Sequence, residues 1–248
     1  MADSFSSDAF CSQKKIWAHF QNHAAETFDA AHPRLDFLLR QIRKRFRHGH
    51  PVVLNVGIGS GYFEQQAVRQ PWEVHSLDPD GCAVARVNAW KVHGHVGLIE
   101  KMPLPTESCD CVVASEVLEH LTDEQGKQAL REVARVLKTG GAFLGTVPYN
   151  ENLSAEQVVC PRCGELFHRW GHHRRFTAES LGQGLSQYFM IEALRRTAFP
   201  PFRGRTLAGK TRSLIRVSLA RLGQMIAVPS LYWYAKKSPG SKAAKKEP

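Results

Sequence analysis

The sequence has few cysteines for its length, no secretory type of leader and no long uninterrupted apolar run. Six cysteines among 248 residues are too few for a disulfide scaffold. Residues 1–10 carry two aspartates and no apolar segment, so we expect no secretory signal there. The longest apolar stretch, 214–235, is interrupted by Arg216, Arg221 and Pro229 and is too polar to cross a bilayer. We therefore expect a cytoplasmic protein.

Acidic residues are nearly missing from the last part of the chain. Residues 195–248 contain 13 Lys and Arg but one acidic residue, Glu247, whereas residues 1–194 contain 20 basic and 22 acidic residues. The formal net charge of +10 therefore arises from one region. A basic appendage on a near-neutral body indicates an attachment surface for something anionic.

Short apolar runs alternate with helical patterns through the middle of the chain. Strands are predicted at 52–56, 73–77, 95–99, 110–115 and 142–147, with helices at 62–69, 81–92 and 123–137. This alternation, with short connections, predicts an α/β fold with a doubly wound, mostly parallel sheet. Two helices are predicted within 14–47, and a helix at 178–186 and strands at 188–197 and 231–235 follow the alternating region.

Composition divides the chain into five parts. We expect an N-terminal helical cap at 1–48, a cofactor-binding core at 49–150 and a Cys/His-rich insertion at 151–176. The C-terminal part of the core, 177–236, includes a basic helical insertion at 200–228 before the last strand. The basic tail at 237–248 has nothing to bury, and we expect it to be disordered.

A glycine-rich loop follows the first buried strand. Gly57, Gly59 and Gly61 stand where a Cβ would block a tight turn or the approach of a ligand. Asp78 ends the next strand, where a carboxylate can accept both hydroxyls of a ribose. Dinucleotides and S-adenosylmethionine are the two cofactor classes that fit such a loop. The third glycine comes too early for the dinucleotide fingerprint G-x-G-x-x-G.

Four motifs in order resemble those of class I S-adenosylmethionine-dependent methyltransferases. They are the segment 53–61 with the glycine loop, Ser76 to Asp80, the segment 102–121 with its Ser-Glu-Val-Leu-Glu-His-Leu stretch, and 134–141 at the end of a helix. The resemblance implies a Rossmann-like, seven-stranded sheet with a reversed terminal hairpin, and S-adenosyl-L-methionine as cofactor. The cofactor-binding residues that it implies are Asn55, Gly57, Gly59, Gly61, Asp78, Pro79, Glu100, Met102 and Ser115.

Two positions differ from the usual pattern of this family. Asn55 stands where an acidic residue is common before the glycine loop. Leu98 and Ile99 stand where many relatives carry an aspartate toward the adenine. We therefore expect backbone groups and apolar side chains such as Met102 to hold the adenine.

Glu116, Glu119 and His120 follow the fourth predicted strand, at the sheet edge where such folds bind ligands. Three interpretations remain open. His120 could be a general base for a hydroxyl acceptor. The three residues also resemble the E-x-x-E-H metal site of small-RNA 2'-O-methyltransferases and a similar stretch of quinone-biosynthetic O-methyltransferases, which implies a divalent metal that lowers the pKa of the attacking hydroxyl. Alternatively, the Glu-His pair merely caps the next helix.

The Cys/His-rich insertion contains a Cys-x-x-Cys pair followed by glycine. Cys160 and Cys163 have the spacing of a zinc knuckle, and His168 with His172 or His173 could complete a Cys2His2 set. A redox pair and unmetallated buried thiols are the alternatives. The segment from His173 also resembles the family's H-x-x-x-F-T-x-E-S-L stretch, so one of the two neighbouring histidines could instead serve the active site or a metal near Glu116.

The basic insertion at 200–228 has three open interpretations. Its apolar and arginine-rich pattern fits a lid that faces an anionic membrane surface, a solvated lid, or a nucleic-acid clamp. The clamp is the weakest, because interleaved aromatic residues are missing. A membrane-facing lid would place a cytoplasmic protein at the inner membrane surface.

Together these patterns predict a methyltransferase that moves a methyl group from S-adenosylmethionine to an oxygen of a small-molecule, lipid-linked or saccharide acceptor. His120, Glu119, Glu116 and His172 are its candidate catalytic residues. Two alternatives stand beside it: a metal-dependent RNA ribose 2'-O-methyltransferase, and a non-catalytic binding module stapled by zinc.

Overall fold

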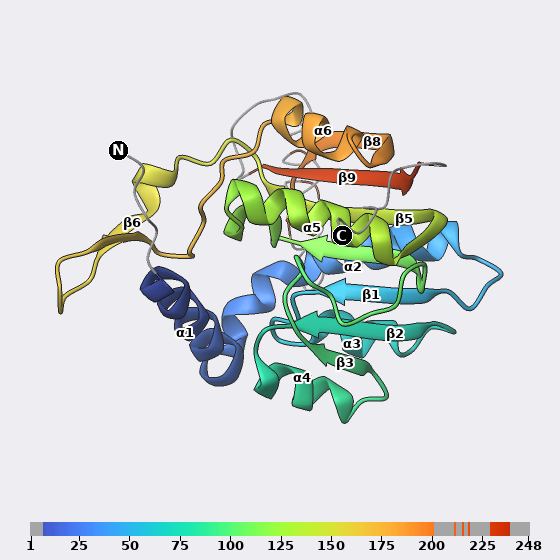
Figure 1. The fold of residues 1–248 in the computed structure, drawn as a ribbon, viewed down its shortest axis with the longest axis horizontal. Helices are drawn as coiled ribbons and strands as arrows, with labels where there is room; N and C mark the ends of the chain where they lie inside the picture. The colour runs from blue at the N-terminus through green and yellow to red at the C-terminus, as the bar shows by residue number, and fades with distance from the viewer. Residues whose placement is uncertain (1–6, 201–210, 212–214, 216–217, 219–228, 239–248) are drawn as a thin grey trace, which may run out of the picture.

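The computed structural model describes residues 7–200, 211, 215, 218 and 229–238, with side chains from residue 15 onward. Its centre is a seven-stranded sheet of order β3-β2-β1-β4-β5-β9-β8 (Figure 1). The strands are β1 (Val52–Val56), β2 (Glu73–Asp78), β3 (His93–Val96), β4 (Cys109–Ser115), β5 (Leu137–Pro148), β8 (Phe189–Thr197) and β9 (Ser230–Lys237). The first five are parallel, and β9 runs antiparallel to both β5 and β8. The predicted doubly wound sheet with a reversed terminal hairpin is confirmed.

Helices cover both faces of this sheet. On one face lie α2 (His32–Arg45), α3 (Tyr62–Ala67) and α4 (Gly81–Asn88), and on the other lie α5 (Asp123–Val136) and α6 (Ala178–Ser186). Two apolar cores result, one on each face of the sheet, which is why β1 is buried on both sides. Helix α1 (Ser7–His23), the 3-10 helix η1 (Ala25–Ala31) and a small hairpin of β6 (Gln157–Val159) and β7 (Leu166–His168) lie at the carboxyl ends of the parallel strands (Figure 1).

Side-chain caps fix where the helices of the second face begin. The hydroxyl of Thr122 accepts from the N–H of Gln125, whose side chain accepts from the N–H of Thr122, so α5 starts with a capping box. Thr177 and Ser180 form the equivalent box for α6. Because Thr122 caps α5, the interpretation that Glu119 and His120 serve as its cap is wrong.

Several element boundaries differ from the predicted ones. Helix α4 ends at Asn88 instead of residue 92, because the side chain of Asn88 accepts a hydrogen bond from the N–H of Gly94 at 2.7 Å. Strand β3 consequently begins at His93, two residues before the predicted start. Helix α5 ends at Val136, and the strand predicted at 142–147 extends from Leu137 to Pro148.

The basic C-terminal segment is partly built into the sheet. Lys237, assigned to the disordered tail from sequence, is the last residue of β9 and is buried. Its ammonium group donates to the carbonyl of Leu137 at 2.8 Å and pairs with Glu107 at 3.1 Å. The expectation that residue 237 has nothing to bury and belongs to a disordered tail is therefore wrong. Residues 239–248 and most of the insertion predicted at 200–228 lie outside the described residues.

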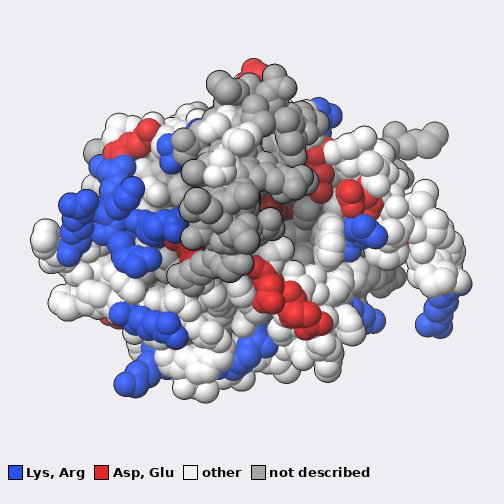
Figure 2. Space-filling view, turned by 180° about the vertical axis from the view of Figure 1, so that it is seen from behind, with Lys and Arg blue, Asp and Glu red and all other residues white. Residues whose placement is uncertain are grey.

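Basic side chains also gather on the body of the molecule. The C-terminal half of α2 exposes Arg40, Arg43, Lys44 and Arg45. Figure 2 shows Lys and Arg side chains close together on one side of the face opposite to that of Figure 1. The charge balance of residues 1–194 thus conceals a local basic surface. Within the described residues, no helix is long and apolar enough to span a membrane.

Candidate active site

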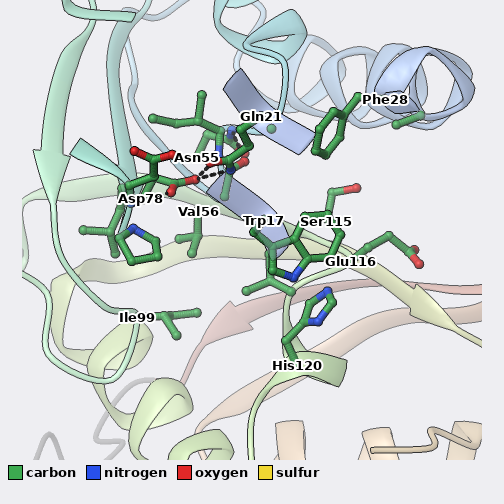
Figure 3. A pocket seen from close by; sticks show the side chains of 18 of the residues that line it. Trp17, Gln21, Phe28, Asn55, Val56, Asp78, Ile99, Ser115, Glu116 and His120 are labelled. Carbon is green, nitrogen blue, oxygen red and sulfur yellow. Dashed lines mark hydrogen bonds between the residues drawn. The ribbon is translucent and has the colours of Figure 1, made fainter. Parts of the chain in front are cut away.

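A cavity of about 680 Å³ opens at the carboxyl ends of β1, β2 and β4. It is lined by Val56, Asp78 and Ser115 from these strand ends, and Trp17 of α1 and Phe28 of η1 line its opposite side (Figure 3). This is the sheet edge where ligands bind in doubly wound folds. The cavity is large enough for a nucleoside-sized cofactor together with part of an acceptor.

The glycine loop gives the cavity a floor of bare backbone. Gly57, Gly59 and Gly61 all have positive φ angles, of 84°, 56° and 83°. A Cβ on Gly61 would stand 2.6 Å from the ring of Trp90, so neither the dihedral nor the space accepts a side chain there. Gly57 and Gly59 line the cavity, where a bound ligand could approach their backbone, whereas Gly61, also expected to bind the cofactor, does not line it.

Asp78 anchors this loop and faces the cavity. Its Oδ2 accepts from the N–H of Ile58 at 2.9 Å and from the side-chain amide of Gln21 at 3.1 Å, and its Oδ1 accepts from the N–H of Asp80 at 2.9 Å. Burial raises the pKa of Asp78, against the lowering effect of these hydrogen bonds. A carboxylate offers about four lone-pair positions, so Asp78 can still accept from a ribose hydroxyl. Pro79, the next residue, also lines the cavity.

Asn55 lines the cavity but uses its amide within the protein. Its Nδ2 donates to Glu64 Oε1 at 2.7 Å and to the carbonyl of Gly57 at 3.1 Å. Glu64 also accepts from the hydroxyl of Ser76 at 2.7 Å, and complete burial raises its pKa. Asn55 and Glu64 therefore hold the glycine loop from the protein side, and Glu64 of α3 does not line the cavity.

Most of the residues expected to hold the adenine line the cavity. Leu98, Ile99 and Glu100 line it, and Glu100 accepts from the side chain of Gln125 at 3.0 Å. Met102 does not belong to the lining: it is buried in the core, and its N–H donates to Glu132. It lies outside because the chain turns away from the cavity after Glu100.

A basic residue, Arg34, lines the cavity beside Ser115 and Glu116. Arg34 of α2 donates through Nε to the hydroxyl of Ser115 at 2.9 Å and lies 3.9 Å from Glu116 Oε1. Glu116 has a positive φ of 56°, which is uncommon for a residue with a side chain and directs it toward Arg34. Arg34 was not predicted, because a lone arginine within a helix gives no positional signal.

Glu119 is a buried carboxylate without hydrogen bonds. Its side chain is fully buried, and neither Oε1 nor Oε2 accepts a hydrogen bond from any residue that the structure describes. Burial, together with the nearby carboxylate of Glu116, raises the pKa of Glu119. An unpaired buried carboxylate is costly, so this group requires either a proton or a cation.

Two imidazoles lie beside Glu119, and the Nδ1 atom of each is held by a hydrogen bond. His120 Nδ1 is 3.2 Å from the carbonyl of Gly171, which can only accept, so Nδ1 carries the proton and Nε2 keeps its lone pair. His172 Nδ1 contacts Glu151 Oε2 at 2.5 Å, with the same consequence for its Nε2. One ligand atom from each of Glu119, His120 and His172 lies within 4.8 Å of the others. Burial lowers the pKa of His120 to about 3, so its imidazole is neutral.

His168 is linked to His172 by Glu151, whose carboxylate contacts both imidazoles. Its Nε2 lies 3.7 Å from Glu151 Oε1, and its Nδ1 accepts from the N–H groups of Trp170 and His172. Glu151 was not predicted, although it follows β5 at the carboxyl edge of the sheet, where polar residues favour a functional role. His173 is bound to this region through its N–H, which donates to the carbonyl of Glu119 at 2.8 Å.

The predicted Cys2His2 set is not assembled. Cys160 and Cys163 lie at the tip of the β6–β7 hairpin, whereas His168 pairs with Gln157 at its base. Three residues of strand separate tip from base, about 10 Å at 3.3 Å per residue. In the described part of the chain, neither cysteine joins a cluster of potential metal ligands. The N–H groups of Cys163 and Arg162 do lower the pKa of the half-buried Cys160 thiol, as in a knuckle.

Comparison with known proteins agrees with this geometry. Residues 54–145 match a family model described as a methyltransferase domain. The chain is 39% identical over 98 residues to a "Probable S-adenosylmethionine-dependent methyltransferase" of Mycolicibacterium smegmatis, a match that covers 39% of this chain and 37% of the relative. It is 28% identical over 220 residues to the ubiquinone/menaquinone biosynthesis C-methyltransferase UbiE of Pasteurella multocida, covering 76% and 81%. The chain thus spans less than half the length of the first of these relatives.

A solved structure shares the whole fold at low identity. The 1,6-didemethyltoxoflavin-N1-methyltransferase of Burkholderia thailandensis, solved with its substrate and S-adenosylhomocysteine, superposes with a TM-score of 0.65 at 14% identity. The superposition covers 96% of this chain and 93% of that one. At this identity the likeness establishes the architecture of the sheet and its flanking helices.

Proposed function

Because the chain belongs to the class I S-adenosylmethionine-dependent methyltransferase superfamily, we propose that it transfers the methyl group of S-adenosylmethionine to a hydroxyl oxygen of an acceptor bound beside Glu116 and His120. The acceptor class is a small molecule, a lipid-linked molecule or a saccharide. The carrying observation is one cavity with two chemically different ends. Asp78 and the glycine loop form one end, and His120 and His172, with Glu119 buried beside them, form the other.

The residues of the first end fit the cofactor. The bare backbone of Gly57 and Gly59 allows close approach, and Asp78 can accept from a ribose hydroxyl. Leu98 and Ile99 offer an apolar surface for the adenine. When bound, the cofactor supplies a methyl group made electrophilic by its sulfonium. The protein then has to orient the acceptor oxygen in line with this methyl and accommodate the acceptor's proton.

The second end fits a divalent cation better than a lone general base. His120 is half-buried, and desolvation lowers the pKa of its imidazole, which weakens it as a general base. Glu119 has both oxygens free for a cation, and His120 and His172 each have a lone pair on Nε2. Glu119, His120 and His172 would hold the ion, with Glu151 and the carbonyl of Gly171 orienting the imidazoles. Such an ion would lower the pKa of a hydroxyl bound to it.

Aromatic side chains close the acceptor end. Trp17 packs edge-on against His120 with ring centroids 5.0 Å apart, and Trp170 also lines the cavity. They exclude water from the reacting groups and offer an apolar surface to the acceptor. RNA ribose methylation and a non-catalytic zinc-stapled module remain the alternatives, and each predicts a different result below.

Calorimetry with S-adenosylhomocysteine tests the cofactor half of the proposal. We expect binding by the wild-type chain and weaker binding by Asp78→Ala. A folded sample that does not bind S-adenosylhomocysteine would support the non-catalytic module and contradict the proposal.

Turnover with labelled S-adenosylmethionine tests the acceptor half. Fractions of a cell extract supply acceptors, and mass spectrometry of the product distinguishes a methylated oxygen from a methylated carbon. We expect an O-methyl product and loss of turnover with EDTA. Labelling confined to RNA 3' ends would favour the ribose alternative, and a C-methyl product would contradict the choice of oxygen.

A further inference from the structure

A second group of metal-ligating side chains lies at the other end of β2, away from the cavity. Glu73 and His75 belong to β2, and His93 and His95 belong to β3, the edge strand of the sheet. His75 pairs with His93 and Leu77 with His95 in the parallel ladder. Register partners point to the same face of a sheet, so the three imidazoles and the carboxylate share one face.

This face is open because a crossover helix is missing. The chain runs from β3 to β4 through residues 97–108, which form no helix, although they are all described. Glu73 and His93 are therefore exposed, while His75 and His95 are half-buried beside them. Figure 1 shows β2 and β3 at this margin of the sheet. Solvent can reach the group without any movement of the fold.

The side chains are already drawn together. Nε2 of His75 is 2.9 Å from Glu73 Oε1, and Nδ1 of His75 is 2.9 Å from Nε2 of His95. The rings of His75 and His95 stack with a 4° interplanar angle, and the ring centroid of His93 is 4.8 Å from that of His75. One ligand atom from each of Glu73, His75 and His93 lies within 4.8 Å of the others.

We propose that Glu73, His75 and His93 form a surface site for a divalent transition-metal ion of the Zn²⁺ type, with His95 orienting His75. Imidazole and carboxylate are the ligand types that Zn²⁺ takes in a set of three protein ligands with one open position. The contact between His75 Nε2 and Glu73 Oε1 is an ordinary hydrogen bond when Nε2 carries the proton, and a cation bound to both atoms would replace that proton. If His75 donates its Nδ1 proton to His95, Nε2 becomes the ligand atom.

The site would connect the sheet edge to the cofactor cavity. Strand β3 leads directly into Gly97, Leu98 and Ile99, which line the cavity. The N–H of Gly97 donates to the carbonyl of Asp78 at 3.1 Å. An ion bound to both β2 and β3 would hold these two strands together at the end remote from the ligand. This inference goes beyond the proposed function and does not depend on it.

Equilibrium dialysis against Zn²⁺ tests the site by stoichiometry. The wild-type chain is compared with His75→Ala/His93→Ala, and with His48→Ala/His50→Ala, which removes two exposed histidines outside the group. We expect the first variant to lose one equivalent of bound Zn²⁺ and the control to lose none. Equal stoichiometry and affinity in wild type and His75→Ala/His93→Ala would overturn the site.

Two further measurements keep the test decisive. His93→Ala alone changes one exposed residue of an edge strand, so it is expected to fold, and its affinity for Zn²⁺ at this site should fall at least about tenfold. Amide hydrogen exchange of β3 should slow when Zn²⁺ is added to the wild type and not when it is added to the variants. Unchanged exchange in the wild type would contradict the proposed link between β2 and β3. S-adenosylhomocysteine binding without Zn²⁺ should persist in all variants, which separates this test from that of the cofactor site.

Discussion

Two groups of carboxylate and imidazole side chains lie in different environments, one beside the cavity and one at the end of β2 remote from it. Beside the cavity, Glu119 is buried and His120 and His172 are half-buried, whereas at the end of β2 remote from the cavity Glu73 and His93 are exposed and His75 is half-buried. Burial makes the difference. Glu119 lacks any hydrogen bond from the described residues, whereas Glu73 is exposed and paired with His75.

This difference indicates how strongly each group needs a ligand. The buried carboxylate is unstable as a bare anion, so a cation there compensates a large desolvation cost. Water solvates the exposed group when no cation is bound. A bound ion there would stabilise the protein only by the difference in free energy between its binding to water and its binding to the protein ligands. The cavity group should therefore be coupled to function and the edge group to local stability.

Glu119→Gln should have the largest effect. The amide keeps the shape of the side chain but loses the charge that attracts a cation, so we expect turnover to fall at least ~100-fold. The increase in Tm on addition of a divalent cation should also shrink. Glu124→Gln, a change at an exposed residue of α5, is the matched control and should leave both quantities unchanged. Full turnover of Glu119→Gln would contradict the inference that the group beside the cavity is coupled to function.

Asp78→Ala should weaken S-adenosylhomocysteine binding by about 10- to 100-fold, because hydrogen bonds to a charged group contribute about 1.5–3 kcal/mol each. Calorimetry measures the change. The variant also removes the acceptor for the N–H of Ile58, so Asp78→Asn, which keeps an acceptor oxygen, should lose less affinity. If both variants bind as tightly as wild type, the cofactor does not use this carboxylate.

Glu151→Gln should have a smaller effect than Glu119→Gln. Glu151 touches His172 and would orient a ligand without binding the ion itself, and loss of such a partner costs about tenfold or somewhat more in metal affinity. Titration with Mn²⁺ or Zn²⁺ at constant pH measures this affinity. A loss as large as that of Glu119→Gln would mean that Glu151 is itself a ligand.

Cys160→Ser/Cys163→Ser should have the smallest effect on the cavity. The thiols stand at the hairpin tip, away from the histidines at its base, so turnover and S-adenosylhomocysteine affinity should stay within about twofold of wild type. A large loss would show that the hairpin tip contributes to the cavity. Zinc bound by these cysteines stays a prediction from their spacing and would be seen as an equivalent lost in metal analysis.

The sequence predicts best those residues whose position follows from the end of a strand. Gly57 directly follows β1, Asp78 ends β2 and His120 comes a few residues after β4, and the parallel order of the strands brings them to one edge. Seven strands and the reversed terminal hairpin followed from the same pattern and from the family resemblance.

Residues whose position depends on tertiary contacts could not be predicted this way. Cys160 and His168 have ligand-like spacing, but the hairpin between them is extended, and spacing alone does not reveal its length. The alignment of His75 with His93 depends on where α4 stops, which is decided by one hydrogen bond from Gly94 to Asn88. Met102 was assigned to the cavity because the turn after Glu100 has no sequence signal.

The contact between α1 and the strand ends has a kinetic consequence. Gln21 donates to Asp78 and Asn22 donates to Asp80, while Trp17 of the same helix covers His120. A ligand that reaches Asp78 must take over or share an acceptor that α1 now uses. The rate of ligand exchange is therefore tied to the motion of this helix, and the fluorescence of Trp17 would report each opening as it happens.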